Sequence, residues 1–202
     1  KMQTLFSDSS IDFISNPIDL CWDNKPSYPN STAFHHDIKY AGKSSTIKIK
    51  EVQEKLNIIP LDFYLLSSLD SIAWLLNIRG DDIKNTPILC SYAIIPNQGK
   101  IELFINSKII HLTKDLENLI NFHPLEKIDE FISTIDNNKI FGIDENSTAY
   151  HFKNLCIKSS ILTYNFENPC LYPKAIKNVV ELNGAKNANI RDGISIVKYL
   201  FW

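Results

Sequence analysis

Short apolar runs of strand length alternate along this 202-residue chain with segments of helical periodicity. The runs with strand character begin near residues 61, 88, 100, 139 and 160. The helical patterns cover about 44–56, 70–76, 113–120, 125–135 and 147–155. Such alternation is typical of an α/β fold, because the helices connect the strands and cover the faces of their sheet. We therefore predict an α/β domain with a mixed sheet and helices on both faces.

The overall composition narrows the class of protein. Apolar residues make up 44% of the chain, and 21 basic residues nearly balance 23 acidic ones, for a net charge of −2. A globular protein is expected from this balance, and nucleic acid is not an expected partner because phosphate binding needs clustered Lys and Arg. The chain contains no window of 18 continuous apolar residues, so no membrane span is predicted. Asp8, Asp12 and Asp19 interrupt its first 20 residues, which do not fit a signal peptide. We expect a cytoplasmic protein.

The residues that most often carry chemistry do not form a recognisable site. His35, His36 and Asp37 suggest metal ligands, but adjacent His side chains diverge on a strand and no third ligand follows at helical spacing. The chain lacks G-x-S-x-G and the Gly-rich phosphate-binding motifs, and it has six glycines in all. Its four cysteines are far apart and three of them stand in apolar stretches, which favours reduced core thiols over disulfides or metal ligands. We predict no catalytic residue and no metal ligand in this chain.

Polar groups concentrate in one place, at residues 77–87, directly after an apolar helical pattern. One interpretation is a solvated connection with a weak ion pair between Arg79 and Asp81 or Asp82. The other is a loop held at the edge of a substrate cleft. For the second interpretation the candidate residues are Trp74, Arg79, Asp81 and Tyr92. Core packing is the alternative for Trp74.

Three stretches of the chain resemble, in the right order, the three-domain aminopeptidase P family, the X-Pro aminopeptidases of the creatinase/prolidase "pita-bread" type. The residues from Leu69 to Ile83, with Pro87 and the run Ser91 to Ile95, are similar to the signature of that family. Trp22-Asp23 with Pro26 and Pro29, followed by Tyr40 to Ser44, resembles the passage from the first domain to the second. Ala175 to Asn178, with Glu181-Leu182 and Ile190 to Gly193, resembles the entry helix of the catalytic domain.

The resemblance implies a division of the chain into three parts. Residues 1–30 would be the tail of the first domain with a linker, 31–174 a creatinase-N-like second domain, and 175–202 the first helix of a truncated metal-binding catalytic domain. The chain would then be a fragment, the non-catalytic middle domain of a longer enzyme. The apolar run from Ile196 to Trp202, which has no helix stop signal behind it, agrees with this expectation.

The same resemblance implies a function for the parent protein. Aminopeptidase P releases the N-terminal residue from peptides with proline in second position, and it uses two divalent metal ions, typically manganese, held by the catalytic domain. None of those metal ligands would lie in this chain, so the fragment alone should be inactive. The apolar stripe of the C-terminal helix would have to be covered, with a homodimer as one solution. The alternative function is a non-catalytic creatinase-like module that binds proteins.

Overall fold

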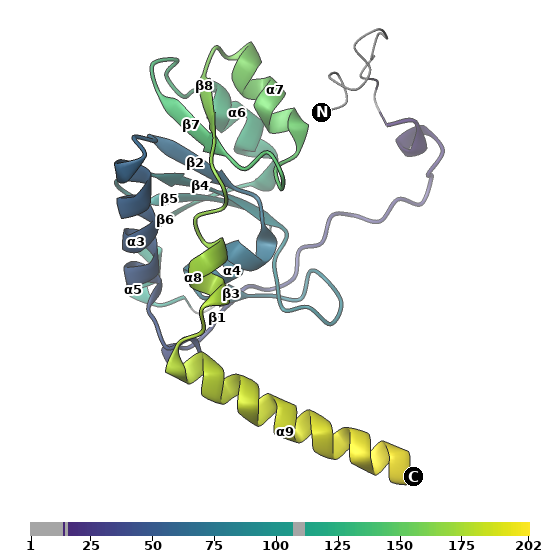
Figure 1. Ribbon diagram of the computed structural model, residues 1–202. Coiled ribbons are helices and arrows are strands. Elements are labelled where there is room, and N and C mark those ends of the chain that lie inside the picture. The colour runs from purple at the N-terminus through teal and green to yellow at the C-terminus, as the bar shows by residue number, and fades with distance from the viewer. Residues whose placement is uncertain (1–13, 15, 107–111) are drawn as a thin grey trace, which may run out of the picture.

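A six-stranded mixed sheet forms the centre of the molecule in the computed structural model, which describes residues 14, 16–106 and 112–202 (Figure 1). In chain order its strands are β2 (Phe63–Leu66), β4 (Ser91–Pro96), β5 (Ile101–Ile105), β6 (Ile120–His123), β7 (Ile140–Ile143) and β8 (Leu162–Asn165). In space the order is β6-β5-β4-β2-β7-β8. β2 pairs antiparallel with β4 and parallel with β7, so it joins two halves of the sheet. β4 and β5 form an antiparallel hairpin. The edge strand β6 pairs in parallel with β5, and the other edge strand β8 pairs in parallel with β7.

Three helices cover one face of this sheet, namely α3 (Ser45–Ile58), α4 (Leu69–Leu76) and α5 (Lys114–Glu117). Ser44 caps α3, because its side chain accepts a hydrogen bond from the backbone nitrogen of Ile47. Apolar side chains spaced along α3 and α4 pack against inward-facing residues of the strands, among them Val52, Leu56, Leu75, Leu76, Tyr64 and Leu103. Each such buried side chain contributes about 1.5–3 kcal/mol to stability.

Two further helices cover the opposite face, α6 (Ile128–Ser133) and α7 (Tyr150–Lys158). Ile132, Phe152 and Cys156 are buried there against Phe104 and Phe141 of the sheet. Helices therefore lie on both faces of a mixed sheet, and the fold class predicted from the sequence is confirmed. The four cysteines are all free; Cys156 and Cys170 are buried core thiols as predicted, but Cys21 is exposed and Cys90 is half-buried, so the predicted core position is wrong for these two.

A second, two-stranded ribbon brings the N-terminal segment to the end of α4. β1 (Phe34–His35) pairs antiparallel with β3 (Ile78–Arg79), so that Phe34 lies opposite Arg79. The short helix α2 (Ile38–Ala41) follows β1 and leads into α3. Two 3₁₀ turns, η1 (Pro17–Leu20) and η2 (Leu125–Lys127), complete the connections. The expected polar loop at 77–87 therefore begins with a short strand.

The chain leaves the domain through α8 (Leu171–Ala175) and the long helix α9 (Val179–Phe201), which extends away from the sheet in Figure 1. Apolar side chains along α9 are exposed, including Ile190, Ile194, Val197, Leu200, Phe201 and Trp202. No helix in the described part of the chain has the length and apolar character needed to cross a membrane.

Two local predictions were wrong. The helix expected at 113–120 ends at Glu117, and Ile120–His123 instead forms β6, with Ile120 opposite Ile101 of β5. The helical spacing of Leu116, Leu119 and Ile120 was misleading, because the backbone after Asn118 finds partners at the sheet edge. The helix expected from Ser147 begins only at Tyr150, with no side-chain cap at its first residue.

Candidate functional site

The C-terminal end of α4 is the best-defined polar structure near the predicted site. Asn77 ends the helix in the left-handed region, with φ 49° and ψ 44°, and its backbone N–H donates to the carbonyl of Ala73. Asn tolerates this conformation better than most residues. The turn directs the chain into β3 and so places Arg79 beside the last turn of α4.

Lys48 of α3 holds this end of α4 from the core side. Its side chain is only 1% exposed. The Nζ atom donates to the carbonyl oxygen of Trp74 at 2.9 Å and to Oδ1 of Asn77 at 2.8 Å, and it lies 4.4 Å from the centroid of the Trp74 ring. Burial lowers the pKa of Lys48 to about 8. The helix end is therefore held by a buried cation rather than by solvent.

Arg79 contacts the same helix end from the outer side. Its Nη1 donates to the carbonyl oxygens of Ala73 at 2.7 Å and Ile78 at 2.8 Å. The side chain is half-buried, and burial lowers the pKa of its guanidinium from the usual value. Within the described ranges, Nε and Nη2 of Arg79 form no hydrogen bond, and the Glu181 carboxylate acts on the guanidinium only through its charge. The guanidinium is thus oriented by main-chain carbonyls, and its other N–H groups remain available for an acceptor.

The loop after β3 is fastened to the N-terminal segment. Asp82 accepts hydrogen bonds from the backbone nitrogens of Ser31 at 2.8 Å and Cys90 at 2.7 Å. The Ser31 hydroxyl oxygen in turn accepts from the backbone nitrogen of Asp81 at 2.9 Å. Gly80 permits the side chain of Leu89 to approach the backbone of the loop closely, since a Cβ atom at position 80 would lie 2.1 Å from Cδ2 of Leu89. The base of the loop is therefore an ordered structure and not a freely solvated connection.

The structure brings together only some of the predicted site residues. Trp74 is 9% exposed within the core, and Arg79 lies at the end of the same helix. Asp81 is exposed at the start of the loop. Tyr92 belongs to the opposite core, where its ring contacts Phe152 of α7 at a centroid distance of 5.0 Å. The side chain of Tyr92 therefore packs on the face of the sheet opposite to α4.

The sequence analysis did not identify three residues that hold the end of α4 and the base of the loop, namely Lys48, Asn77 and Asp82. A signal for Lys48 existed, because it stands within the apolar stripe of α3 formed by Ile49, Val52 and Leu56. A lysine at such a position must find buried acceptors. Asp81 and Asp82 could not be told apart by sequence, since only the structure shows which carboxylate meets backbone N–H groups.

The described residues do not fit a two-metal centre. Among residues 14, 16–106 and 112–202, no three His, Cys, Asp or Glu side chains come together in a group that could hold a metal ion. Asp37 instead caps α2 by accepting from the backbone nitrogen of Lys39 at 2.8 Å. The backbone nitrogen of its neighbour His36 donates to the carbonyl of Asn77 at 2.7 Å. The His35-His36-Asp37 sequence thus has structural contacts of its own.

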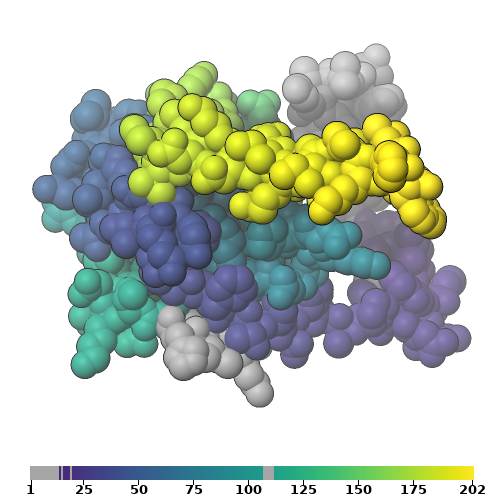
Figure 2. Space-filling model, turned by 90° about the horizontal axis from the view of Figure 1, so that it is seen from below, coloured from purple at the N-terminus to yellow at the C-terminus, as the bar shows by residue number. Residues whose placement is uncertain are grey.

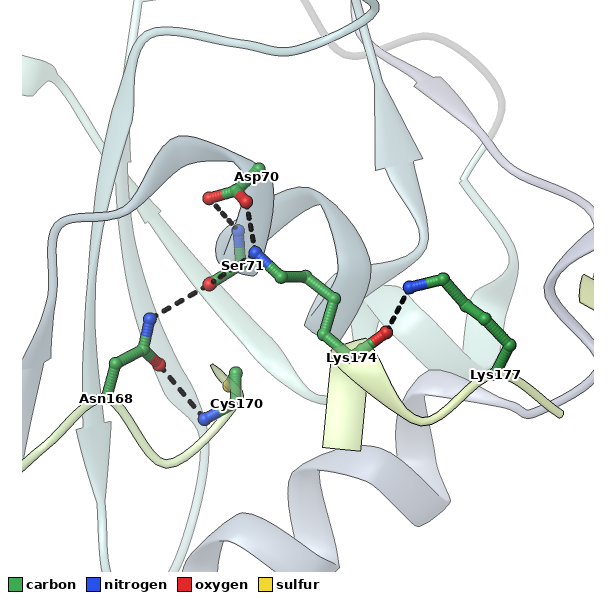
Figure 3. A network of polar contacts seen from close by, with 6 residues as sticks. All are labelled: Asp70, Ser71, Asn168, Cys170, Lys174 and Lys177. Atoms are coloured by element: carbon green, nitrogen blue, oxygen red, sulfur yellow. Dashed lines mark hydrogen bonds and ion pairs between the residues drawn. The ribbon is translucent and has the colours of Figure 1, made fainter. Parts of the chain in front are cut away.

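A separate polar network joins the start of α4 to the segment that leads to α9 (Figure 3). The amide of Asn168 donates to the Ser71 hydroxyl at 2.9 Å and accepts from the backbone nitrogen of Cys170 at 2.9 Å. Lys174 of α8 forms an ion pair with Asp70 and lies 3.4 Å from the Ser71 hydroxyl. Both ends of α4 are therefore held by polar contacts from other elements.

Comparison with known proteins gives consistent matches. Residues 24–181 match the family described as Creatinase/Prolidase N-terminal domain. The chain is 37% identical over 180 residues to Xaa-Pro aminopeptidase 1 of Dictyostelium discoideum, which covers 88% of this chain and 28% of that protein. It is 32% identical over 193 residues to a probable Xaa-Pro aminopeptidase P of Laccaria bicolor, covering 93% of this chain and 30% of that protein.

A solved structure has the same fold. The crystal structure of an X-prolyl aminopeptidase from Caenorhabditis elegans, described as a cytosolic enzyme with a di-nuclear active site, superposes with a TM-score of 0.81 at 23% identity. The match covers 95% of this chain and 32% of that one. The chain thus spans about 30% of the length of the relatives it matches.

Proposed function

Because this chain belongs to the Creatinase/Prolidase N-terminal domain family, we propose that it is the non-catalytic middle domain of an Xaa-Pro aminopeptidase. The observation that carries the proposal is the 37% identity to Xaa-Pro aminopeptidase 1 of Dictyostelium discoideum along 88% of the chain. In this proposal residues 1–30 are the tail of a preceding domain with a linker, 31–174 the domain itself, and 175–202 the first helix of the catalytic domain.

The chemistry belongs to the remainder of the longer protein. That remainder supplies the ligands of two divalent metal ions, manganese in our proposal, and the substrate is a peptide with proline in second position. A two-metal centre needs several converging carboxylate or imidazole groups, and no such group occurs among the described residues. The proposed site of action is the cytoplasm, as in the relative from Caenorhabditis elegans.

We assign the loop at 77–87 to the rim of the substrate cleft. Its base is ordered by Asp82, and Arg79 keeps N–H groups for which no described residue is an acceptor. The loop after β3 and helix α9 extend toward the same side of the domain in Figures 1 and 2. In our proposal the catalytic domain follows α9 on that side. Arg79 and Asp81 would face the cleft, and Trp74 and Tyr92 would support it from the two cores.

The exposed apolar face of α9 is covered in this proposal by the rest of the catalytic domain. In the chain alone, the same face would pair with a second copy, since exposed stripes of this kind promote association. A homodimer of the isolated chain would therefore not report the association of the longer enzyme.

Peptidase assays on two proteins test the proposal. The isolated chain, supplied with manganese and an Xaa-Pro peptide, should release no N-terminal residue. The longer protein that contains this chain should cleave that peptide, and should lose the activity on dialysis against a chelator. A peptide with alanine in place of the proline is the control substrate. Proline-dependent turnover by the isolated chain, or a longer protein inactive on Xaa-Pro peptides, would overturn the proposal.

A further inference from the structure

Asn178 contacts the ends of two different helices. Its Oδ1 accepts hydrogen bonds from the backbone nitrogens of Val180 at 2.9 Å and Glu181 at 3.0 Å, which caps the N-terminus of α9. Its Nδ2 donates at 2.8 Å to the carbonyl oxygen of Ala41, the last residue of α2. Glu181 completes the capping box by accepting from the Asn178 backbone nitrogen at 2.9 Å. One carboxamide therefore joins the start of α9 to the end of α2.

The residue type at position 178 fits this double contact. Asp and Ser cap helices about as well as Asn, so the cap of α9 does not by itself require an amide. The bond to Ala41 does require one, because a carboxylate has no donor and a Ser hydroxyl is too short to serve both helices. The contact between the helices thus depends on the amide N–H of Asn178.

Gly42 leaves the space that Asn178 occupies. Gly42 ends α2 in the left-handed region at φ 68°, and its backbone N–H donates to the carbonyl of Ile38 at 2.7 Å. A Cβ atom at position 42 would lie 2.3 Å from Oδ1 of Asn178, far inside van der Waals contact. A side chain at this position would displace Asn178 even if the backbone accepted it.

The turn at Gly42 is also fixed from its other side. The carbonyl oxygen of Lys43 accepts from Nδ2 of Asn77 at 2.9 Å. Asn77 is the residue that ends α4 and leads to Arg79, and its Oδ1 is held by Lys48. Two side-chain hydrogen bonds, joined by the backbone of residues 41–43, therefore connect the start of α9 to the base of the 77–87 loop.

The segment before Asn178 has an anchor of its own. Lys174 is paired with Asp70 at the start of α4, and Lys177 Nζ donates to the Lys174 carbonyl at 2.5 Å (Figure 3). Beyond its first turn α9 extends away from the domain (Figure 1). The direction of α9 is consequently set where it begins.

We propose that Asn178 is a positioning residue that fixes the direction of α9 relative to the 77–87 loop. Its effect on catalysis rests on the proposed function, because the catalytic domain would follow α9 and meet that loop. The joint itself can be measured on the chain alone, so the two proposals can fail independently.

Distance measurements between two spin labels test the joint. The exposed Cys21 and the half-buried Cys90 are first replaced by Ser, and labels are attached to K158C on α7 and K186C on α9. Dilution with unlabelled chain removes distances between copies. The unsubstituted joint should give one narrow distribution. N178D and N178S, which keep a capping oxygen but lose the donor to Ala41, should broaden it about twofold or more, as expected of a helix released to swing.

The matched control is N189D in the middle of α9. Asn189 also donates its Nδ2 to a main-chain carbonyl, that of Ala185 at 2.8 Å, but within the same helix. N189D should leave the distance distribution narrow, and circular dichroism should show that all variants keep the helix. Narrow distributions in both Asn178 variants would overturn the proposal. Loss of α9 helicity in both would also overturn it, because Asn178 would then act only as a cap.

Discussion

Lys48 Nζ lies 4.4 Å from the centroid of the Trp74 ring and donates to the carbonyl oxygen of the same residue at 2.9 Å. The face of the indole ring carries the negative part of its quadrupole, and the carbonyl oxygen is an acceptor. The ring and the carbonyl therefore both favour the protonated amine of Lys48. Burial acts in the opposite direction and prevails, because it lowers the pKa of Lys48 to about 8. The contact therefore holds the end of α4, but burying the protonated amine costs free energy, and this cost depends on pH.

The first prediction concerns that pH dependence. In the unfolded chain Lys48 stays protonated to about pH 10.5, whereas in the folded chain it loses its proton near pH 8. Between these values the unfolded state binds more protons, so the free energy of unfolding rises with pH, by about 2 kcal/mol at about pH 9.5. Below pH 8 both states are protonated and this gain is absent. Denaturant titrations of wild type and K48M across this range should diverge accordingly.

The control for Lys48 is K50M on the exposed side of the same helix. Its unfolding free energy should follow the wild-type curve at each pH. If the wild-type and K48M curves run parallel from pH 7 to about pH 9.5, Lys48 does not titrate as described.

The second prediction separates two adjacent carboxylates of the loop. D82A removes the acceptor for the backbone nitrogens of Ser31 and Cys90 and should destabilise the domain by about 2 kcal/mol. D81A removes an exposed side chain and should change stability by less than about 0.5 kcal/mol. Hydrogen exchange of the Ser31 and Cys90 amides should accelerate in D82A alone. Equal exchange in both variants would mean that Asp82 does not hold the loop.

The third prediction tests Arg79 in the longer enzyme. R79A should lower kcat/KM for an Xaa-Pro peptide by about tenfold, through KM, while the metal content stays unchanged, because it removes a group at the cleft rim and no metal ligand. Since Arg79 also binds the carbonyls of Ala73 and Ile78, the melting temperature must be measured alongside. K158A on the far side of the sheet serves as the control. If the kinetics of R79A are unaltered, the proposal that the 77–87 loop lies at the rim of the cleft is wrong.

The fourth prediction concerns the exposed face of α9. The chain of 202 residues should associate as its concentration rises, because Ile194, Val197, Leu200 and Phe201 are exposed on this helix. A chain that ends at residue 176 should be monomeric and keep its sheet, since neither apolar core includes a residue of α9. Light scattering and circular dichroism would measure both properties. An unfolded truncated chain would place α9 in the core of the domain and the proposed boundary at 174 in the wrong position.

The sequence was informative where one periodicity dominated. The hairpin of β4 and β5 and the helices α3 and α4 follow from apolar spacing and turn residues, and their predicted ranges lie within a few residues of the observed ones. β6 was missed because an edge strand buries little, so Asn121 stays polar while Leu116 and Ile120 imitate a helix. β1 and β3 have two residues each, too few for any period to appear.

The sequence indicated which segment holds the candidate site, but not which of the candidate residues lie close together. Trp74 and Arg79 lie at one helix end, as their separation of five positions allows. Tyr92 faces the other core, and this depends on the register of β4 against β2, where a shift by one residue exchanges the two faces. The roles of Lys48 and Asn178 depend on contacts with residues 29 and 137 positions away, which no local pattern contains.

The position of β2 between β4 and β7 has a consequence for how the chain folds. β2, β4, β5 and β6 lie close together in sequence, and β7, α7 and β8 form a second local unit. The pairing of Phe63 with Phe141 closes a much longer loop, and the carboxylate of Asp62 binds Ile140 N and Lys139 Nζ at the same place. Among the strand pairings of the six-stranded sheet, this one closes the longest loop and carries the greatest entropic cost of closure, so we expect it to form last and open first. Mechanical or thermal stress should therefore divide the domain along the line between β2 and β7.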